Sequence, residues 1–171
     1  GSVRGVAALS AMPIFLNTRN PNVKTIRDFT TASRIALPAV KSSAQAMFLQ
    51  MAAEQAFGEG SFARLDALTI SMAHPEATAL LLSGRGEIDS NFSSPPFQYQ
   101  QLEHAGVRTV LNSYDVLGGP ATLFMVWTTA KFHDANPKTY AAFLAALEDA
   151  NAFIAKDRRG AAELYVQKSR D

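Results

Sequence analysis

Cysteine is absent from the 171 residues of the sequence. This absence excludes disulfides, thiolate catalysis and cysteine-based zinc sites. No apolar run is long enough to cross a bilayer, so the sequence predicts no direct membrane insertion. Charge is also sparse, because the formal net charge is +1 and neither sign forms a block. We therefore expect no nucleic-acid partner, since such partners are attracted by a basic surface.

Motifs for catalysis and cofactor binding are missing as well. No Gly-x-Ser-x-Gly elbow presents a serine nucleophile. Gly84 and Gly86 follow a predicted helix and do not extend to a dinucleotide fingerprint or a P-loop. The three histidines lack the i,i+4 spacing of a helical zinc site, and no carboxylate cluster supplies a calcium or magnesium cage. We expect no catalytic residue, no metal and no cofactor.

The residues that are present predict an α/β fold. Apolar residues make up 47% of the chain, which is enough for a well-packed core at this length. Strand-like and helix-like segments alternate four times, with strands expected at residues 35–37, 68–72, 87–92 and 107–112 and helices at residues 42–57, 74–83 and 97–102. This alternation predicts a mixed, mainly parallel sheet with helices on both faces. The short, polar segment 87–92 is interpreted as a strand that reaches the rim.

Two long extended segments bracket this alternating part. The first covers residues 6–16 and bends at Met12 and Pro13. The second covers residues 122–129, follows a break at residues 118–120 and contains Trp127, the only tryptophan. A long amphipathic helix after Pro137 and a last helix after Asp157 complete the chain.

Residues 34–57 are interpreted as a buried strand, a polar turn and a long helix. The helical spacing of five residues predicts the core-facing side: Ala44, Met47, Phe48, Met51 and Ala52. Ser42 or Ser43 is suited to cap this helix, and Gln45 follows in its first turn. Because a helix start carries unpaired amides and a partial positive charge, it can hold an anion. The alternative is a capped helix with nothing bound.

The loops after the other predicted strands contain further candidates. In an open α/β sheet these loops converge at the carboxyl ends of the strands, where ligands bind. His74 is either an N-terminal cap or a donor to a ligand. Asn91 and Phe92 are either an amide and a ring facing the ligand, or a residue at a strand end and a core aromatic.

Several of these segments together resemble a known family. They are Met12 with Pro13, residues 35–46, residues 79–80 with Gly84 and residues 87–89, residues 94–97, and residues 136–138 before the long helix. In order and spacing they are similar to the solute-binding proteins of bacterial ABC importers, in particular the nitrate, sulfonate and taurine group. The same superfamily contains the thiamin pyrimidine-precursor proteins.

The resemblance implies a type II periplasmic-binding-protein lobe. Residues 1–16 would be a crossing segment from a missing first lobe, residues 17–120 the second α/β lobe, and residues 121–171 the return crossing strand and the C-terminal helices of the first lobe. The complete protein is then expected to begin further upstream, with a signal peptide in the preceding part, and to be a periplasmic monomer.

The family pattern also implies a ligand site and two partners. It assigns ligand binding to Ser42, Ser43 and Gln45, and further to Met12, His74 and Asn91. The expected ligand is a small anionic solute, either a sulfonate, nitrate or a related organic acid, and the expected protein partner is a membrane permease. The chain is therefore expected to be no enzyme.

Two other functions stay open at this stage. One is a pyrimidine-precursor synthase of the same superfamily, with a pyridoxal-type cofactor and with Lys41 and His74 as the candidate residues. The other is a fragment that has no activity of its own.

Overall fold

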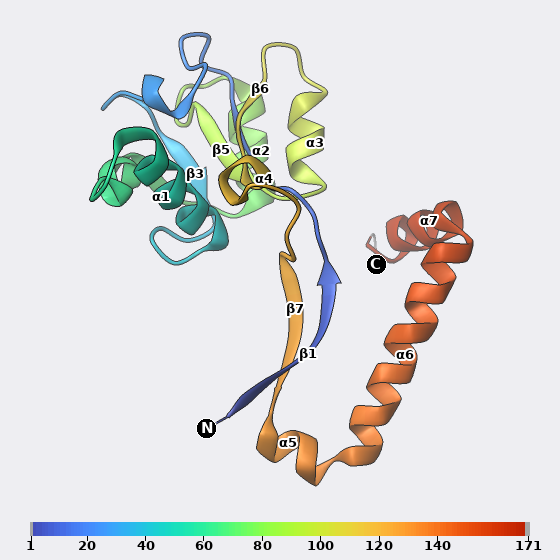
Figure 1. The fold of residues 1–171 in the computed structure, drawn as a ribbon. Helices are drawn as coiled ribbons and strands as arrows, with labels where there is room; N and C mark the ends of the chain where they lie inside the picture. Colours follow the sequence, from blue (N-terminus) through green and yellow to red (C-terminus); the bar gives the residue numbers. More distant parts are fainter. Residues whose placement is uncertain (1, 170–171) are drawn as a thin grey trace. The chain divides into compact units, whose positions relative to one another are not determined.

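The structure is a computed structural model that describes residues 2–169 (Figure 1). It contains two compact units, one of residues 9–124 and one of residues 2–8 together with 125–169. All the buried residues of the described chain belong to the first unit. The hydrophobic core therefore lies in the larger unit alone.

A five-stranded sheet forms the centre of the larger unit, in the order β4-β3-β5-β2-β6. Its strands are β2 (Phe15–Thr18), β3 (Ile35–Leu37), β4 (Thr69–Ser71), β5 (Ser90–Ser93) and β6 (Arg108–Asn112). β3 pairs in parallel with β4 and β5, whereas β2 pairs antiparallel with β5 and β6. β2 alone thus runs against the other strands of this sheet. The predicted mixed, mainly parallel sheet is confirmed.

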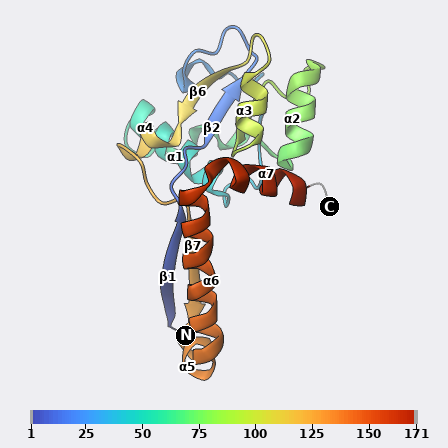
Figure 2. The same ribbon diagram turned by 90° about the vertical axis from the view of Figure 1, so that its right-hand side faces the viewer.

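Helices cover both faces of this sheet (Figures 1 and 2). They are α1 (Ala44–Phe57), α2 (His74–Ser83), α3 (Phe97–Leu102) and α4 (Ser113–Leu117), with 3-10 helices η1 (Ile26–Asp28) and η2 (Phe62–Leu68). Successive side chains of a strand point to opposite faces. Ile35 and Leu37 accordingly join the core cluster that contains α1, while Ala36 packs with Ala77 and Leu81 of α2.

The core-facing side of α1 was predicted only in part: Ala52 is buried and Phe48 packs against the core, but Ala44, Met47 and Met51 are exposed. The buried residues of this helix are Gln45, Ala46, Leu49, Ala52 and Ala53, whereas the side chains of Met47 and Met51 are exposed by 56% and 40%. The helix is apolar on nearly all sides, so spacing alone does not define its phase. Alanines on the buried side let the helix backbone lie close to the sheet.

Two strands also differ from the expectation. β5 was predicted as a strand that reaches the rim, but it lies between β3 and β2 and all four of its residues are buried. The extended segment predicted for residues 6–16 is divided, because its last residues, Phe15 and Leu16, begin β2 inside the sheet. The polar side chains of β2 and β5 can be buried because neighbouring elements supply their hydrogen-bond partners. Examples are Asn17 of β2 and Ser90 and Asn91 of β5.

The smaller unit is a strand pair with three helices. β1 (Val3–Ser10) pairs with β7 (Phe124–Thr129), and α5 (Ala130–Ala135), α6 (Pro137–Lys156) and α7 (Arg158–Lys168) follow. Hydrogen bonds join the amide of Ala130 to the carbonyl of Ser2 and the amide of Leu123 to the carbonyl of Ser10, so the pair is antiparallel. No helix within residues 2–169 is long and apolar enough to cross a membrane.

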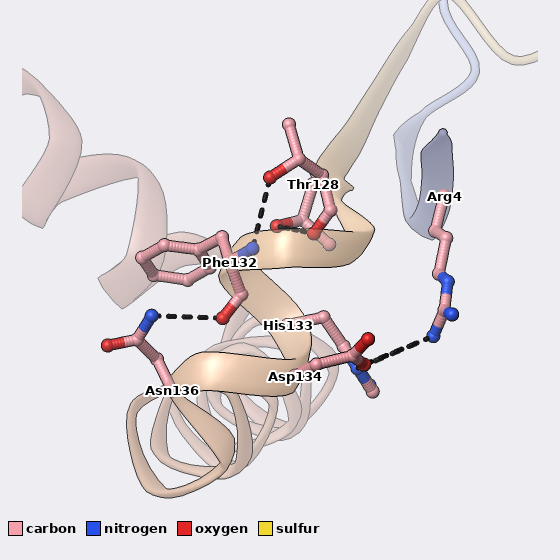
Figure 3. Close-up of polar contacts among 7 residues, drawn as sticks. Arg4, Thr128, Phe132, His133, Asp134 and Asn136 are labelled. Atoms are coloured by element: carbon pink, nitrogen blue, oxygen red, sulfur yellow. Dashed lines mark hydrogen bonds and ion pairs between the residues drawn. The ribbon is translucent and has the colours of Figure 1, made fainter. Parts of the chain in front are cut away.

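Polar contacts around α5 join it to β1 (Figure 3). Thr129 caps the helix by accepting a hydrogen bond from the amide of Phe132. Asp134 lies 2.8 Å from Nδ1 of His133 and 3.6 Å from the guanidinium of Arg4. The hydrogen bond from His133, assisted by the charge of Arg4, lowers the pKa of Asp134. Because the carboxylate is exposed, these contacts add little stability.

Candidate functional site

The carboxyl edge of the sheet collects the helix starts of the larger unit. Each of β3, β4, β5 and β6 is followed by a helix or a helical turn at this edge, and β2 begins there because it runs in the opposite direction. Phe15 at the start of β2 accordingly pairs with Ser93 at the end of β5. Ligands bind at this edge in open α/β sheets.

The start of α1 is capped by Ser43. Its hydroxyl oxygen accepts a hydrogen bond from the amide of Ala46 at 3.2 Å and donates to the carbonyl of Ala39 at 2.8 Å. Ser42 is exposed, and its hydroxyl lies 3.4 Å from the carbonyl of Val40. Within residues 2–169, no acceptor reaches the amides of residues 44 and 45. The helix start therefore offers two free amides beside an exposed hydroxyl.

His74 connects α1 with β5. Its Nε2 lies 3.5 Å from the side-chain nitrogen of Gln45, and its Nδ1 lies 3.3 Å from the hydroxyl of Ser93. Gln45 is 8% exposed and Ser93 is fully buried, so the ring joins two side chains that are fixed by their surroundings. The ring of Phe97, in the first turn of α3, lies 5.8 Å from the imidazole between ring centroids.

Burial lowers the pKa of His74, because the half-buried ring loses solvent that would stabilise its charged form. Burial therefore favours the neutral form of the imidazole. The first turns of α1 and α3 contain no charged residue. Lys41, before α1, Glu76, in the first turn of α2, and Asp115, in the first turn of α4, are charged and exposed. The edge thus presents mainly neutral donors.

The segment that contains Met12 reaches the same edge. Met12 is half-buried between β1 and β2. Next to it, the side chain of Gln98 donates to the carbonyl of Pro13 and accepts from the amide of Phe15, both at 3.0 Å. Ser113 at the start of α4 bonds to both backbone groups of Ile14. The course of the chain beside Met12 is therefore fixed by α3 and α4.

Asn91 lies inside the protein and takes part in a buried polar network. Its amide nitrogen donates to the carbonyl of Ala36 at 3.0 Å, and its amide oxygen accepts from Gln101 at 2.8 Å. Gln101 also donates to Thr78 and accepts from Asn17. The side chain of Asn91 has both its polar atoms bonded within the protein, whereas Gln45, His74, Ser42 and Ser43 lie together around two helix starts.

Sequence reasoning missed three residues of this edge: Ser93, Gln98 and Ser113. Each was assigned only to a loop or to a predicted element, because a serine or glutamine has no spacing that distinguishes a buried partner from an exposed one. One signal was available in Ser113, which directly follows a predicted strand and so lies where helix starts are expected.

A separate groove of about 530 Å³ follows the exposed side of α1. It is lined by Met47, Gln50, Met51, Glu54, Gln55 and Phe62. Among residues 2–169 no group of three or more potential metal ligands occurs. The helix starts, with their unpaired amides, are the candidate anion site of the larger unit.

Comparison with solved structures assigns the chain to the fold of periplasmic sulfonate-binding proteins. It superposes on the alkanesulfonate-binding protein SsuA from Xanthomonas axonopodis pv. citri bound to MOPS, with a TM-score of 0.73 and 17% identity over 98% of this chain and 55% of that one. For the periplasmic aliphatic sulphonate-binding protein SsuA from Escherichia coli the TM-score is 0.68 and the identity 18%, over 96% of this chain and 52% of that one.

The chain thus spans about half the length of these structures. At these identities the likeness establishes the fold, and it confirms the expected fold class and the resemblance to sulfonate-type solute-binding proteins at that level. No protein-family model and no curated protein sequence matches the chain.

Proposed function

We propose that the chain is part of a solute-binding protein of an ABC importer, which captures a small anionic solute and delivers it to a membrane permease. Sulfonates, nitrate and related organic acids are the solutes considered. One observation carries this proposal: free amides at the start of α1 lie beside the exposed hydroxyl of Ser42, and Gln45 of that helix contacts His74 at the start of α2. Helix starts of this kind favour negative charge.

The two comparison structures support the proposal because both are sulfonate-binding proteins with the same fold. Ser42, Ser43 and Gln45 are the proposed primary contacts, and Met12 and His74 line the same edge. Asn91 is the weakest member of the proposed set, since Ala36 and Gln101 already occupy its amide. In the complete protein, residues 17–120 form the second lobe, and the flanking segments belong to the crossing and to a first lobe.

The same proposal includes the location and the mode of action. The complete protein acts in the periplasm as a monomer, where closure of two lobes around the solute creates the form that the permease recognises. Neither a cofactor nor a metal takes part. The first lobe supplies the remaining contacts, so the isolated chain is expected to bind its solute more weakly than the complete protein.

A titration of the labelled chain with ethanesulfonate, nitrate and taurine tests the proposal. We expect the amide resonances of residues 42–46 to shift with at least one of these solutes, and a matching rise in melting temperature. Replacing Ser42 and Ser43 together by Ala should weaken binding at least tenfold, because the exposed hydroxyl of Ser42 is removed and the helix start loses the Ser43 cap that orders its amides. The lost cap costs about 1 kcal/mol of stability.

Ser61→Ala is the matched control, because Ser61 precedes η2 and its side chain makes no cap hydrogen bond. This variant should bind like the parent chain. Unchanged solute binding in the Ser42 and Ser43 double variant would show that the site has been placed on the wrong helix.

A further inference from the structure

His74 is the group at this edge whose charge can change near neutral pH. Its two ring nitrogens face Gln45 and Ser93, which belong to different elements. With the amide group of Gln45 donating, the neutral ring carries its proton on Nδ1 and donates it to the hydroxyl of Ser93. A second proton can be added without loss of either contact, because the Gln45 amide can turn its oxygen to the ring.

Protonation of His74 therefore adds a positive charge to the edge while the contacts of the ring with Gln45 and Ser93 are kept. The ring lies in the first turn of α2 and contacts the side chain of Gln45, whose backbone amide is one of the two free amides at the start of α1. The charged groups on the surrounding elements are Lys41, in the loop before α1, and Glu76, on α2 itself; β5 and the first turns of α1 and α3 contribute none.

We propose that protonation of His74 places a positive charge beside the bound anion, so that the solute is held more tightly at acidic pH than at neutral pH, while both ring nitrogens keep their contacts with Gln45 and Ser93. This inference rests on the proposed function and adds regulation of the same site. An imidazolium beside the helix starts attracts an anion more strongly than the neutral ring does. By linkage, a bound anion must in turn favour the protonated ring. Solute affinity consequently rises as the pH falls.

Ethanesulfonate is the probe for this inference, because its own charge does not change over the pH range used. We expect it to bind about five- to tenfold more tightly at about pH 5 than at about pH 7.5, at constant ionic strength. Titration of the His74 ring resonances in the 171-residue chain should show that saturating ethanesulfonate raises the pKa of His74 by the logarithm of that affinity ratio.

Two variants separate His74 from general charge effects. His74→Gln, which cannot be protonated, should give an affinity that is nearly independent of pH. His104→Gln is the control, because His104 is exposed and follows the far end of α3; it should keep the full pH dependence of the parent. The ring titration of the parent chain tests the inference even if His74→Gln fails to fold.

The outcomes distinguish the two proposals. Ethanesulfonate binding that is independent of pH, with an unchanged pKa of His74, overturns the proton control and leaves the anion site in place. Persistent pH dependence in His74→Gln overturns it as well. Absence of binding at every pH, with the amides of residues 42–46 unmoved, overturns the proposed function together with the inference that rests on it.

Discussion

At the residue scale, Gly84 shows how one backbone position connects two elements. It ends α2 in a left-handed conformation with φ of 68°, which glycine adopts without strain. The guanidinium of Arg19 lies directly against it and donates to the carbonyls of Leu81 and Leu82 in the last helical turn. Gly84 therefore ends the helix and also leaves room for the Arg19 side chain, which donates hydrogen bonds to these carbonyls.

Gly84→Ala is expected to lower the free energy of unfolding by about 2 kcal/mol in urea denaturation. About half of this cost is left-handed strain, and the other half follows because a Cβ would lie 2.8 Å from Nη1 of Arg19 and displace it from two carbonyls. Gly86→Ala is the matched control. Gly86 has φ of 82° but nothing within 4 Å of its Cβ position, so only the strain applies. Equal losses in the two variants would contradict the role given to Arg19.

The position of a single residue was predicted well where local sequence determines it, and its contacts were predicted poorly where they depend on tertiary packing. Ser43 was one of two predicted caps for α1 because serine favours helix starts, and its hydroxyl does cap the helix. The start of α2 at His74 and Pro75 was predicted correctly, but His74 is the first helical residue and Ala73, not His74, is the N-cap. Its contacts with Gln45 and Ser93 could not be predicted, since they depend on the distance between two helix starts that are far apart in the sequence.

At the element scale, α3 is held to the sheet by polar side chains. Gln98 and Gln101 are fully buried, and all their side-chain groups have partners in β2, β5, α2 or the segment before β2. A polar group that loses its partner in the low-dielectric interior costs free energy. Because any shift of α3 would break these hydrogen bonds, the network favours one position of the helix. The network fixes α3, and with it Phe97 at the site.

Gln101→Leu is expected to destabilise the larger unit by about 2 to 3 kcal/mol, because Asn91 and Thr78 then have buried polar atoms without partners. Urea unfolding followed by circular dichroism measures the loss. The exposed neighbour Gln100 provides the control, and Gln100→Leu should change stability by less than about 0.5 kcal/mol. A small effect of the Gln101 substitution would mean that water or rearrangement satisfies the abandoned groups.

The alternating strands and helices of the larger unit were predictable from the spacing of apolar residues and from the glycines, prolines and capping residues at their ends. α3 was predicted with its observed ends, and β3 likewise. α4 and α5 were missed because each is short, at five and six residues, and does not complete two turns of a recognisable pattern. β5 was assigned to a rim because its polar residues suggested solvent, while the residues that satisfy them come from α2, β2 and β3.

At the scale of the whole molecule, the two units differ in how much they bury. Among residues 2–169 every buried residue belongs to the larger unit, while large apolar side chains of the smaller unit are exposed, among them Trp127 at 60% and Met125 at 59%. Unpartnered apolar surface of this extent does not stabilise secondary structure. The difference could not be predicted from apolar content, because both units contain apolar strands and amphipathic helices.

Hydrogen exchange of the isolated chain should report this difference directly. Amides of β3, β5 and α1 are expected to exchange at least about a hundredfold more slowly than those of β7 and α6, because opening them requires unfolding of the core. Exchange resolved by mass spectrometry or NMR measures the ratio, and α3 serves as an internal reference for a short helix that is buried. Comparable protection in α6 would indicate that its apolar side is covered in solution.

The reversed direction of β2 has a mechanical consequence. Because this strand starts where its neighbours end, the polypeptide joins the sheet at Ile14, at the edge where the helices begin. The side chains of Gln98 and Ser113 form hydrogen bonds to its backbone there. A pull or twist on the preceding chain therefore acts first on these two side chains, and through them on the helices that begin beside the proposed anion site. The point where the chain enters the unit thus lies at the same edge as that proposed site.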